Sequence, residues 1–379
     1  MSVSITTLKN SLNRKFRGAS LDDVQGIEDF TLFGEAASNL LSKIDPYETV
    51  RLHRFNLFGN VTDYSVPPDL KGKKVIDPRP QDGRSGEDYS QTFSKEFNRD
   101  REIGKISVEM VDGSKVLRVS GIGKSSQKVD QTSATTEWAA AGGATGLEID
   151  EVIRLDNSDT LRFDLGAAGG YIEAGVAGTM TQVDLTDFLS IGSFFRKVYI
   201  PTAAQAATIT SITLRIGSAS GAYYQITGAI HFGSWKVGVN LVRFDWADAT
   251  TTGSPAITAI DYERLTFVTT AAIADVRTGP LYVRLALPYE TPYYSNSLFT
   301  DSTGVTYRSV PTAVTDLVVL EEEAKNLFFY ECCELIADDL QLDSEAKKFK
   351  FKLHGDPEKA GDDNGLYGQY KRDKPTEAL

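Results

Sequence analysis

The chain has 379 residues, of which 41% are hydrophobic and 24% charged, a composition that suits a folded protein of two or three domains. No apolar run approaches the roughly 20 residues that a membrane-spanning helix needs, so we expect no membrane span. The N-terminal segment is basic and lacks an apolar core, so we expect no secretory signal.

The net charge of −12 is unevenly distributed along the chain. Lys and Arg number 19 against 18 Asp and Glu in residues 1–127, 11 against 17 in 128–290, and 10 against 17 in 291–379. A surface that holds nucleic acid through dense phosphate contacts needs clustered Lys and Arg. The acidic composition argues against such a surface, although it is compatible with a channel through which DNA slides.

The N-terminal 45 residues show helical periodicity and predict two helices separated by a break at Gly18. Pro46 ends the second, because the residue before a proline is pushed out of helical geometry. The apolar positions are Leu8, Leu12, Phe16, Ile27, Phe30, Phe33, Ala37, Leu40, Leu41 and Ile44.

Residues 49–80 change to strand-like runs broken by turn residues, which predicts a small β element. Residues 80–105 are polar and rich in charge, which is typical of a long loop or extended arm. Residues 106–121 alternate around Asp112-Gly113 and predict a β-hairpin.

Beyond Gly121 the chain becomes rich in Ser, Thr, Ala and Gly, and about eight short strands recur with turn signals between them. This pattern predicts an antiparallel β-sandwich, or jelly roll, over 128–290, inserted between residues 1–127 and 291–379. The expected fold class is therefore α+β multidomain, with the helical chain ends and a small β element packed together.

The strongest predicted helix spans 317–340, with Thr315 or Asp316 as its cap. Its apolar stripe needs a partner, and we expect that partner to be the N-terminal helices, which would join both chain ends in one core. The stripe consists of Leu317, Leu320, Ala324, Leu327, Phe328, Cys332, Leu335, Ile336 and Leu340. A second helix is expected around 344–353. Cys332 and Cys333 are adjacent in the predicted helix, so we expect them to be buried rather than disulfide-bonded.

The sequence lacks recognisable catalytic motifs, so we expect no enzyme and no cofactor. His53, His231 and His354 are far apart, and each is expected in a strand or an exposed turn. Three pairs of aspartates at predicted loop ends are more typical of solvated turns, but a structural calcium ion is the alternative. The pairs are Asp156 with Asp159, Asp184 with Asp187, and Asp245 with Asp248.

Aromatic residues are the means by which a sandwich could stack on sugar rings. The candidates are Trp138, Tyr171, Tyr223, Tyr224, Trp235 and Trp246, of which Tyr223, Tyr224 and Trp235 are the candidate glycan-stacking residues. Strict alternation after Val239 places Val242, Phe244 and Trp246 on one strand face, which we expect to be core.

Two stretches resemble phage connector proteins, and the central region resembles a domain of other virion proteins. Residues 37–81, "ASNLLSKIDPYETVRLHRFNLFGNVTDYSVPPDLKGKKVIDPRPQ", are similar to the start of phage connector and tail-tubular adaptor proteins, with a Y-x-x-P-x-D turn at Tyr64, Pro67 and Asp69. The C-terminal acidic helix and "LYGQYKRDKPTEAL" resemble the ends of those proteins, and the central region resembles jelly-roll domains of carbohydrate-binding-module type in virion proteins.

This resemblance implies a virion structural protein, a head-to-tail adaptor forming a ring of copies beneath the portal and above tail or neck proteins. Double-stranded DNA would pass through its channel without specific binding, and the sandwich would be an outward spacer. The expected contacts with copies or partners are Leu317, Leu320, Leu327 and Phe328 of the predicted helix and Tyr367, Tyr370, Lys371 and Arg372 of the C-terminal tail, taken as an arm that orders on docking. The alternative is a surface protein that binds host glycans, and a glycan hydrolase or lyase is a third hypothesis.

Overall fold

The computed structural model describes residues 3–17, 21, 24, 26–75, 79–80, 105–111, 113–120, 126–130, 132, 135–175, 180–355 and 365–373. Most of the predicted arm at 80–105, residues 121–125 and the last six residues of the tail lie outside them. The chain forms two compact units: Met1–Arg54, Val66–Arg79 and Glu290–Leu379 make the helical unit, and Phe55–Ser65 with Pro80–Tyr289 make the sandwich unit. The described residues within 55–65 and 105–120 thus lie in the sandwich unit, whereas we expected residues 1–127 to belong with the chain ends.

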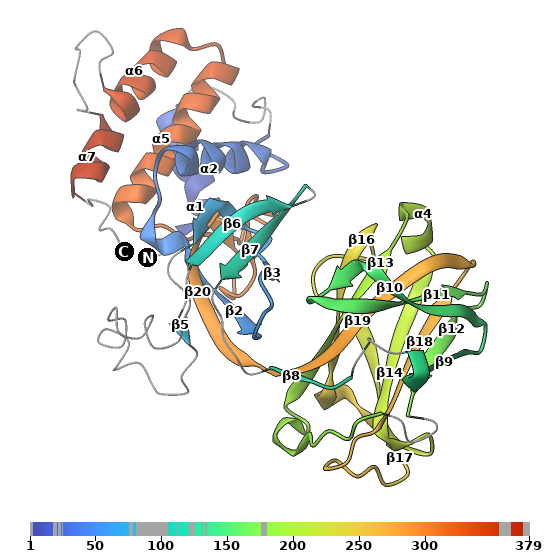
Figure 1. The fold of residues 1–379 in the computed structure, drawn as a ribbon. Helices are drawn as coiled ribbons and strands as arrows, with labels where there is room; N and C mark the ends of the chain where they lie inside the picture. Colours follow the sequence, from blue (N-terminus) through green and yellow to red (C-terminus); the bar gives the residue numbers. More distant parts are fainter. Residues whose placement is uncertain are drawn as a thin grey trace. The chain divides into compact units, whose positions relative to one another are not determined.

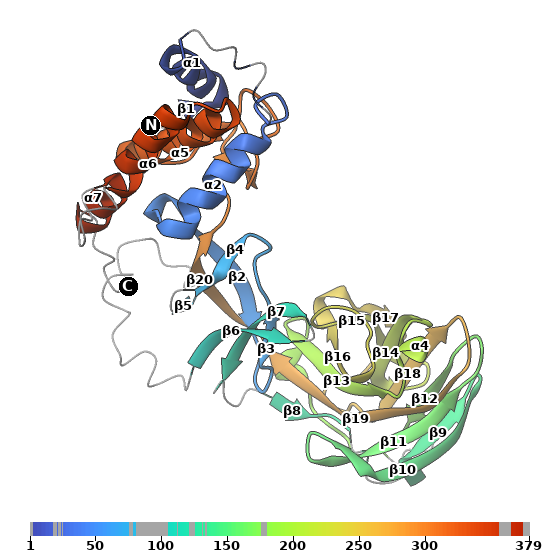
Figure 2. The same cartoon turned by 90° about the horizontal axis from the view of Figure 1, so that it is seen from above.

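Both chain ends share one core in the helical unit. Its helices are α1 (Ile5–Lys15), α2 (Thr31–Lys43), α5 (Glu322–Asp339), α6 (Asp343–His354) and α7 (Leu366–Asp373), which Figures 1 and 2 show gathered together. The Ser4 hydroxyl caps α1 by accepting the backbone N–H of Thr7. The core joins Leu8, Leu40, Leu327 and Phe328, so the predicted partnership of the N-terminal helices with the acidic helix is confirmed.

The start of the acidic helix was predicted wrongly. Leu317–Val318 form strand β23, which pairs with β1 (Val3–Ser4) and β21 (Phe299–Thr300), and β21 also pairs with β22 (Tyr307–Arg308). The Asp316 carboxylate accepts the backbone N–H groups of Thr312 and Ala313, so it closes a turn and does not cap a helix. The buried Cys332 and Cys333 carry free thiols, as expected.

A second small sheet has the strand order β2–β20–β4, with β5 also pairing with β20. Its strands are β2 (Val50–Leu57), β20 (Leu287–Ser295), β4 (Leu70–Val75) and β5 (Arg79–Pro80). Asp69, which precedes β4, accepts the hydroxyls of Tyr293 (2.8 Å) and Ser295. The segment from Leu287 to Ser295 is therefore a strand that runs across residue 290, where we expected the inserted sandwich to end.

The sandwich unit includes the sheet β3–β7–β6, whose last two strands are the predicted hairpin. These strands are β3 (Asp63–Ser65), β6 (Lys105–Val111) and β7 (Ser114–Ser120). The Tyr64 hydroxyl accepts the backbone N–H of Phe58 at 2.9 Å, and the rings of Phe58, Tyr64 and Phe195 surround His231 at centroid distances of 6.2, 5.3 and 5.5 Å. The predicted β element between residues 49 and 80 thus exists, and part of it contacts the sandwich.

The sandwich itself has two antiparallel layers. The first layer contains β8 (Ser126–Lys128), β10 (Ala144–Leu155), β11 (Ser158–Leu165), β19 (Ile273–Leu285), β13 (Gly192–Ile200) and β16 (Gly238–Asp245). The second layer contains β9 (Trp138–Ala141), β12 (Gly170–Ala174), β18 (Tyr262–Thr269), β14 (Ile209–Ala219), β15 (Ala222–Ile230) and β17 (Thr250–Thr252). The end of β15 pairs with β16 and joins the layers, which Figure 2 shows from above.

The sandwich core confirms the predicted alternation of β16. Val242 and Phe244 are fully buried and Trp246 is 3% exposed, and all three belong to one apolar cluster. Phe163 of the first layer and Phe267 of the second meet with ring centroids 5.9 Å apart. Aromatic packing of this kind fills the space between the two layers and leaves the opposite face of each layer outward.

Among the described residues, no helix is long and apolar enough to cross a membrane.

Candidate functional site

The outer face of the second layer carries a row of aromatic and planar polar side chains. Successive side chains of a strand point to opposite faces, so the neighbours of the core residues Ile172, Leu214 and Leu265 point outward. We call this surface the tyrosine–arginine face, and it is defined by Tyr171, Glu173, Arg215, Tyr223, Gln225, Tyr262 and Arg264.

Strand register places these residues in three adjacent rows across the layer. The middle row is charged and polar, and it runs in register through Glu173, Arg264, Arg215, Gln225 and Thr250. Tyr171 lies in the row on one side of it, beside Thr266 and Thr213. Tyr262 and Tyr223 lie in the row on the other side, separated by Gly217.

Guanidinium groups lie over two of these rings. Cζ of Arg264 is 3.3 Å from the ring centroid of Tyr171, and Cζ of Arg215 is 4.6 Å from that of Tyr223. Such stacking is favourable because the ring face is electron-rich. Tyr171 and Tyr223 are both half-buried, so each ring is fixed by its neighbours while part of it stays accessible.

Gly217 explains how Tyr223 and Tyr262 approach each other. Their ring centroids are 6.4 Å apart on either side of this glycine. A Cβ atom at position 217 would lie 2.1 Å from the carbonyl oxygen of Ala222 and 2.6 Å from Cα of Tyr223. Only glycine therefore allows the tight approach of β14 and β15 at this register shift.

Hydrogen bonds fix the polar members of the face. Nε of Arg215 donates to Oε1 of Gln225 at 2.8 Å, and the buried Tyr262 hydroxyl donates to Oε2 of Glu173 at 3.3 Å. Burial, followed by the nearby Glu173 carboxylate, raises the pKa of Tyr262 to about 12, so its hydroxyl stays protonated. Nε of Arg264 is buried and finds no acceptor among the described residues.

The three candidate glycan-stacking residues do not share a surface. Tyr223 lies on the tyrosine–arginine face, whereas Tyr224 points to the core and meets Trp246 with ring centroids 5.4 Å apart. Trp235 follows β15 and packs partly against the core. The alternation that placed Trp246 inward also separates Tyr223 from Tyr224, so the sequence contained this signal, but it did not reveal the partners of Tyr223 on other strands.

The predicted contact residues of the helical unit are mostly buried. Leu320, Leu327 and Phe328 are at most 3% exposed, and Leu317 is half-buried in β23. Tyr367 and Tyr370 are 6% and 8% exposed in α7. This part of the tail therefore packs on the helical unit, whereas we expected it to become ordered only on docking to a partner. Lys371 is exposed, and the side chain of Arg372 lies outside the described part of the chain.

This burial removes the reason for expecting contacts between copies at the apolar stripe. The stripe carries more apolar positions than α2 alone covers, but α1, α6 and α7 also pack against α5. The role of these residues in assembly stays a prediction.

At least one member of each aspartate pair considered for calcium forms a hydrogen bond or an ion pair within the sandwich unit. Asp156 lies 2.7 Å from Lys197 and Asp159 lies 3.1 Å from Arg154. The Asp184 carboxylate accepts the N–H of Thr186, and Asp245 accepts the hydroxyl of Ser193. Calcium at these positions stays a prediction.

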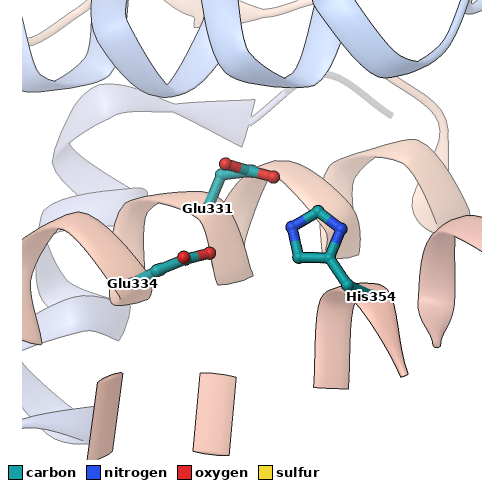
Figure 3. A group of neighbouring side chains, drawn as sticks. All are labelled: Glu331, Glu334 and His354. Atoms are coloured by element: carbon teal, nitrogen blue, oxygen red, sulfur yellow. The ribbon is translucent and has the colours of Figure 1, made fainter. Parts of the chain in front are cut away.

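Figure 3 shows Glu331, Glu334 and His354, three potential metal ligands of the helical unit whose ligand atoms lie within 4.8 Å of one another. The ammonium group of Lys43 already lies 2.6 Å from Oε1 of Glu331 and 3.3 Å from Nε2 of His354. The Tyr367 hydroxyl also donates to Glu331. Burial, together with Lys43, lowers the pKa of His354, which in the structure ends α6 and does not lie in a strand or turn. The ammonium group of Lys43 therefore occupies the place that a metal ion would take. The cluster connects α2, α5, α6 and α7.

No family model and no curated protein match the sequence. Among solved structures, a family 11 carbohydrate-binding module from Clostridium thermocellum, in complex with a β-1,3-1,4-mixed-linked tetrasaccharide, is similar at 7% identity and TM-score 0.30, covering 42% of this chain and 94% of that chain. The CBM22-1 xylan-binding domain of Paenibacillus barcinonensis Xyn10C is similar at 12% identity and TM-score 0.26, covering 42% and 92%. The structural neighbours of this chain, over part of its length, are thus carbohydrate-binding modules.

Proposed function

We propose that this protein binds a polysaccharide, without catalysis, through the tyrosine–arginine face. The observation that carries the proposal is the register of three rows of aromatic and planar polar side chains, most of them half-buried, across four neighbouring strands. Aromatic rings and a few convergent hydrogen-bonding groups are the usual lining of small-molecule and sugar sites.

The position of these residues supports binding rather than packing. They lie opposite the core, so the fold of the sandwich does not require rings and guanidinium groups there. A sheet face that only met solvent would carry scattered polar residues, because stacked rings and arginines lose side-chain entropy. Fixing them in advance lowers the entropic cost of binding.

The experiment is a glycan array with the full-length chain and two variants. Tyr223→Ala should weaken binding by about tenfold or more, because one ring contact and the support of Arg215 are lost. Tyr199→Ala is the matched control: this tyrosine is also half-buried beneath an arginine, Arg277 at 5.4 Å, but lies on the outer face of the first layer. Failure of the wild-type protein to bind any glycan, or equal losses in both variants, would contradict the proposal.

A second candidate function is the adaptor role implied by the resemblance of the chain ends to phage connectors. The two chain ends that carry this resemblance share one core. Native mass spectrometry of the full-length chain should then give a closed ring, which Phe351→Asp on the exposed side of α6 should disrupt, since Phe351 is 47% exposed. A monomer at all concentrations would contradict the adaptor role and leave polysaccharide binding unaffected.

A further inference from the structure

Arg215 and Arg264 lie directly opposite each other on neighbouring strands of the tyrosine–arginine face. Cβ atoms of such a pair are about 4.5–5.5 Å apart, and like charges in this position destabilise a sheet. Each guanidinium leans away from the other onto a tyrosine, Arg264 onto Tyr171 and Arg215 onto Tyr223. The strand pairing therefore holds two positive charges together that repel each other.

These two arginines differ from most arginines of the sandwich unit in their lack of a counter-ion. Within the described residues, neither lies within ion-pair distance of a carboxylate. Others do pair: Arg118 with Asp63 at 2.9 Å, Arg196 with Glu263 at 2.8 Å and Arg243 with Asp245 at 2.6 Å.

The one carboxylate in the same row forms no ion pair with either arginine among the described residues. Glu173 lies opposite Arg264 in the register but accepts the hydroxyl of Tyr262. Nε of Arg215 is occupied by Gln225, whereas the buried Nε of Arg264 has no acceptor among the described residues. A buried donor without a partner costs free energy, and the hydrogen bonds of Arg264 are thus incompletely satisfied.

We infer that the ligand of this face is an acidic polysaccharide whose uronate carboxylate binds between Arg215 and Arg264. The inference rests on the proposed function and names its substrate class. A carboxylate accepts parallel N–H bonds from a guanidinium, and one placed between the two arginines removes their repulsion. The Nε2 amide group of Gln225 and the hydroxyls of Thr213 and Thr266 are left to bind sugar hydroxyls.

The stacking geometry favours this ligand over a neutral glycan. The guanidinium of Arg264 already covers one face of the Tyr171 ring, with Cζ 3.3 Å from the ring centroid. A sugar that approaches this face therefore contacts the edge of the guanidinium and not the ring. Two arginines are too few to hold the dense phosphates of a nucleic acid, particularly in a chain of net charge −12. A polysaccharide with at most one carboxylate per sugar has a charge density that two arginines can match.

The test compares polygalacturonate and alginate with the same polymers after chemical reduction of their carboxylates to alcohols. Affinity electrophoresis of the full-length chain should show retardation by at least one acidic polymer and a loss of about tenfold or more with its reduced counterpart, as expected when a charge-assisted hydrogen bond is lost. Added salt should weaken binding to the acidic polymer only.

Variants assign the effect to the two arginines. Arg215→Gln and Arg264→Gln should each weaken binding of the acidic polymer by about tenfold, a loss larger than any change in binding of the reduced polymer. Arg264→Lys keeps the charge and the sheet contacts of the stem, so it should recover part of the affinity if Arg264→Gln fails to fold. Arg162→Gln, on the first layer with 39% side-chain exposure, removes the same charge and should have no effect.

The outcomes separate the two claims. Equal binding of acidic and reduced polymers overturns the acidic ligand and leaves polysaccharide binding standing. No binding of any polysaccharide overturns both. Binding of single-stranded DNA in preference to every polysaccharide also overturns both, and it would assign the face to a nucleic acid.

Discussion

A single buried cation with two carboxylates lies between the layers of the sandwich. Arg196 and Glu263 are fully buried and Asp130 is 2% exposed. Nη1 of Arg196 lies 2.8 Å from Oε1 of Glu263, and Nη2 bonds to Asp130, which also accepts the backbone N–H of Leu281. Burial, only partly offset by Arg196 and reinforced by Asp130, raises the pKa of Glu263 well above its ordinary value.

Glu263→Gln should therefore flatten the pH dependence of stability. A raised folded pKa stabilises the protein fully below the unfolded value near 4.5, and this contribution is lost as the pH rises through the folded pKa. Urea unfolding should show the wild-type protein losing stability relative to Glu263→Gln as the pH rises above 4.5. Parallel pH profiles of wild type and Glu263→Gln would contradict this account.

Asp130→Ala should instead lower the free energy of unfolding by about 3–5 kcal/mol, because it removes the carboxylate that bonds to Nη2 of the buried Arg196.

His231 should titrate far below an ordinary histidine. Burial, followed by the positive charge of Arg243, lowers its pKa from 6.5 to about 4. The depressed value means that His231 contributes stability above pH 6.5 that is lost as the pH falls toward 4. In an NMR titration the ring protons of His231, assigned with His231→Gln, should move with a midpoint near 4. A midpoint near 6.5 would show that Phe58 and Tyr64 do not cover it.

At the scale of elements, local periodicity predicted most helices and strands. It failed where the conformation of a segment depends on pairing with strands far away in the sequence. The hairpin at 106–121 and the strand from Val239 follow from turn residues and alternation alone. Leu317–Val318 became a strand because Val3–Ser4 and Phe299–Thr300 are available to pair with it, which no local pattern reveals. For the same reason, the sequence identified Tyr223 as a candidate but not Arg215, Arg264 or Tyr262, which meet it through registers between β14, β15 and β18.

Gly217→Ala tests the geometry of this element directly. The new Cβ would meet the backbone of Ala222 and Tyr223, so we expect a loss of about 1–3 kcal/mol in unfolding free energy and a loss of polysaccharide binding. Gly221→Ala, in the same hairpin, has open space around its Cβ and is the control. Thermal melting and affinity electrophoresis give the two readouts. Equal stability and binding of both variants would mean that β14 and β15 do not approach as described.

At the scale of the whole molecule, the two units have separate cores, and each should respond to its own mutations. Leu327 is 1% exposed in the helical unit, so Leu327→Ala should destabilise that unit by about 2–5 kcal/mol. Differential scanning calorimetry of the full-length chain should show two transitions, of which only one shifts in this variant. Phe351→Ala, at an exposed position of α6, should shift neither. A single transition that moves as a whole would show that the units unfold together.

The central claim is that the tyrosine–arginine face holds a polysaccharide, and hydroxyl-radical footprinting tests it most directly. The full-length chain is oxidised with and without polygalacturonate oligosaccharides, and modified tyrosines are measured by mass spectrometry. The account predicts that oxidation of Tyr171 and Tyr223 falls when the oligosaccharide is present, while that of Tyr199 and of Tyr47, which is 72% exposed, does not change. Protection of Tyr199 or Tyr47 with Tyr171 and Tyr223 unchanged would place the glycan elsewhere and contradict the claim.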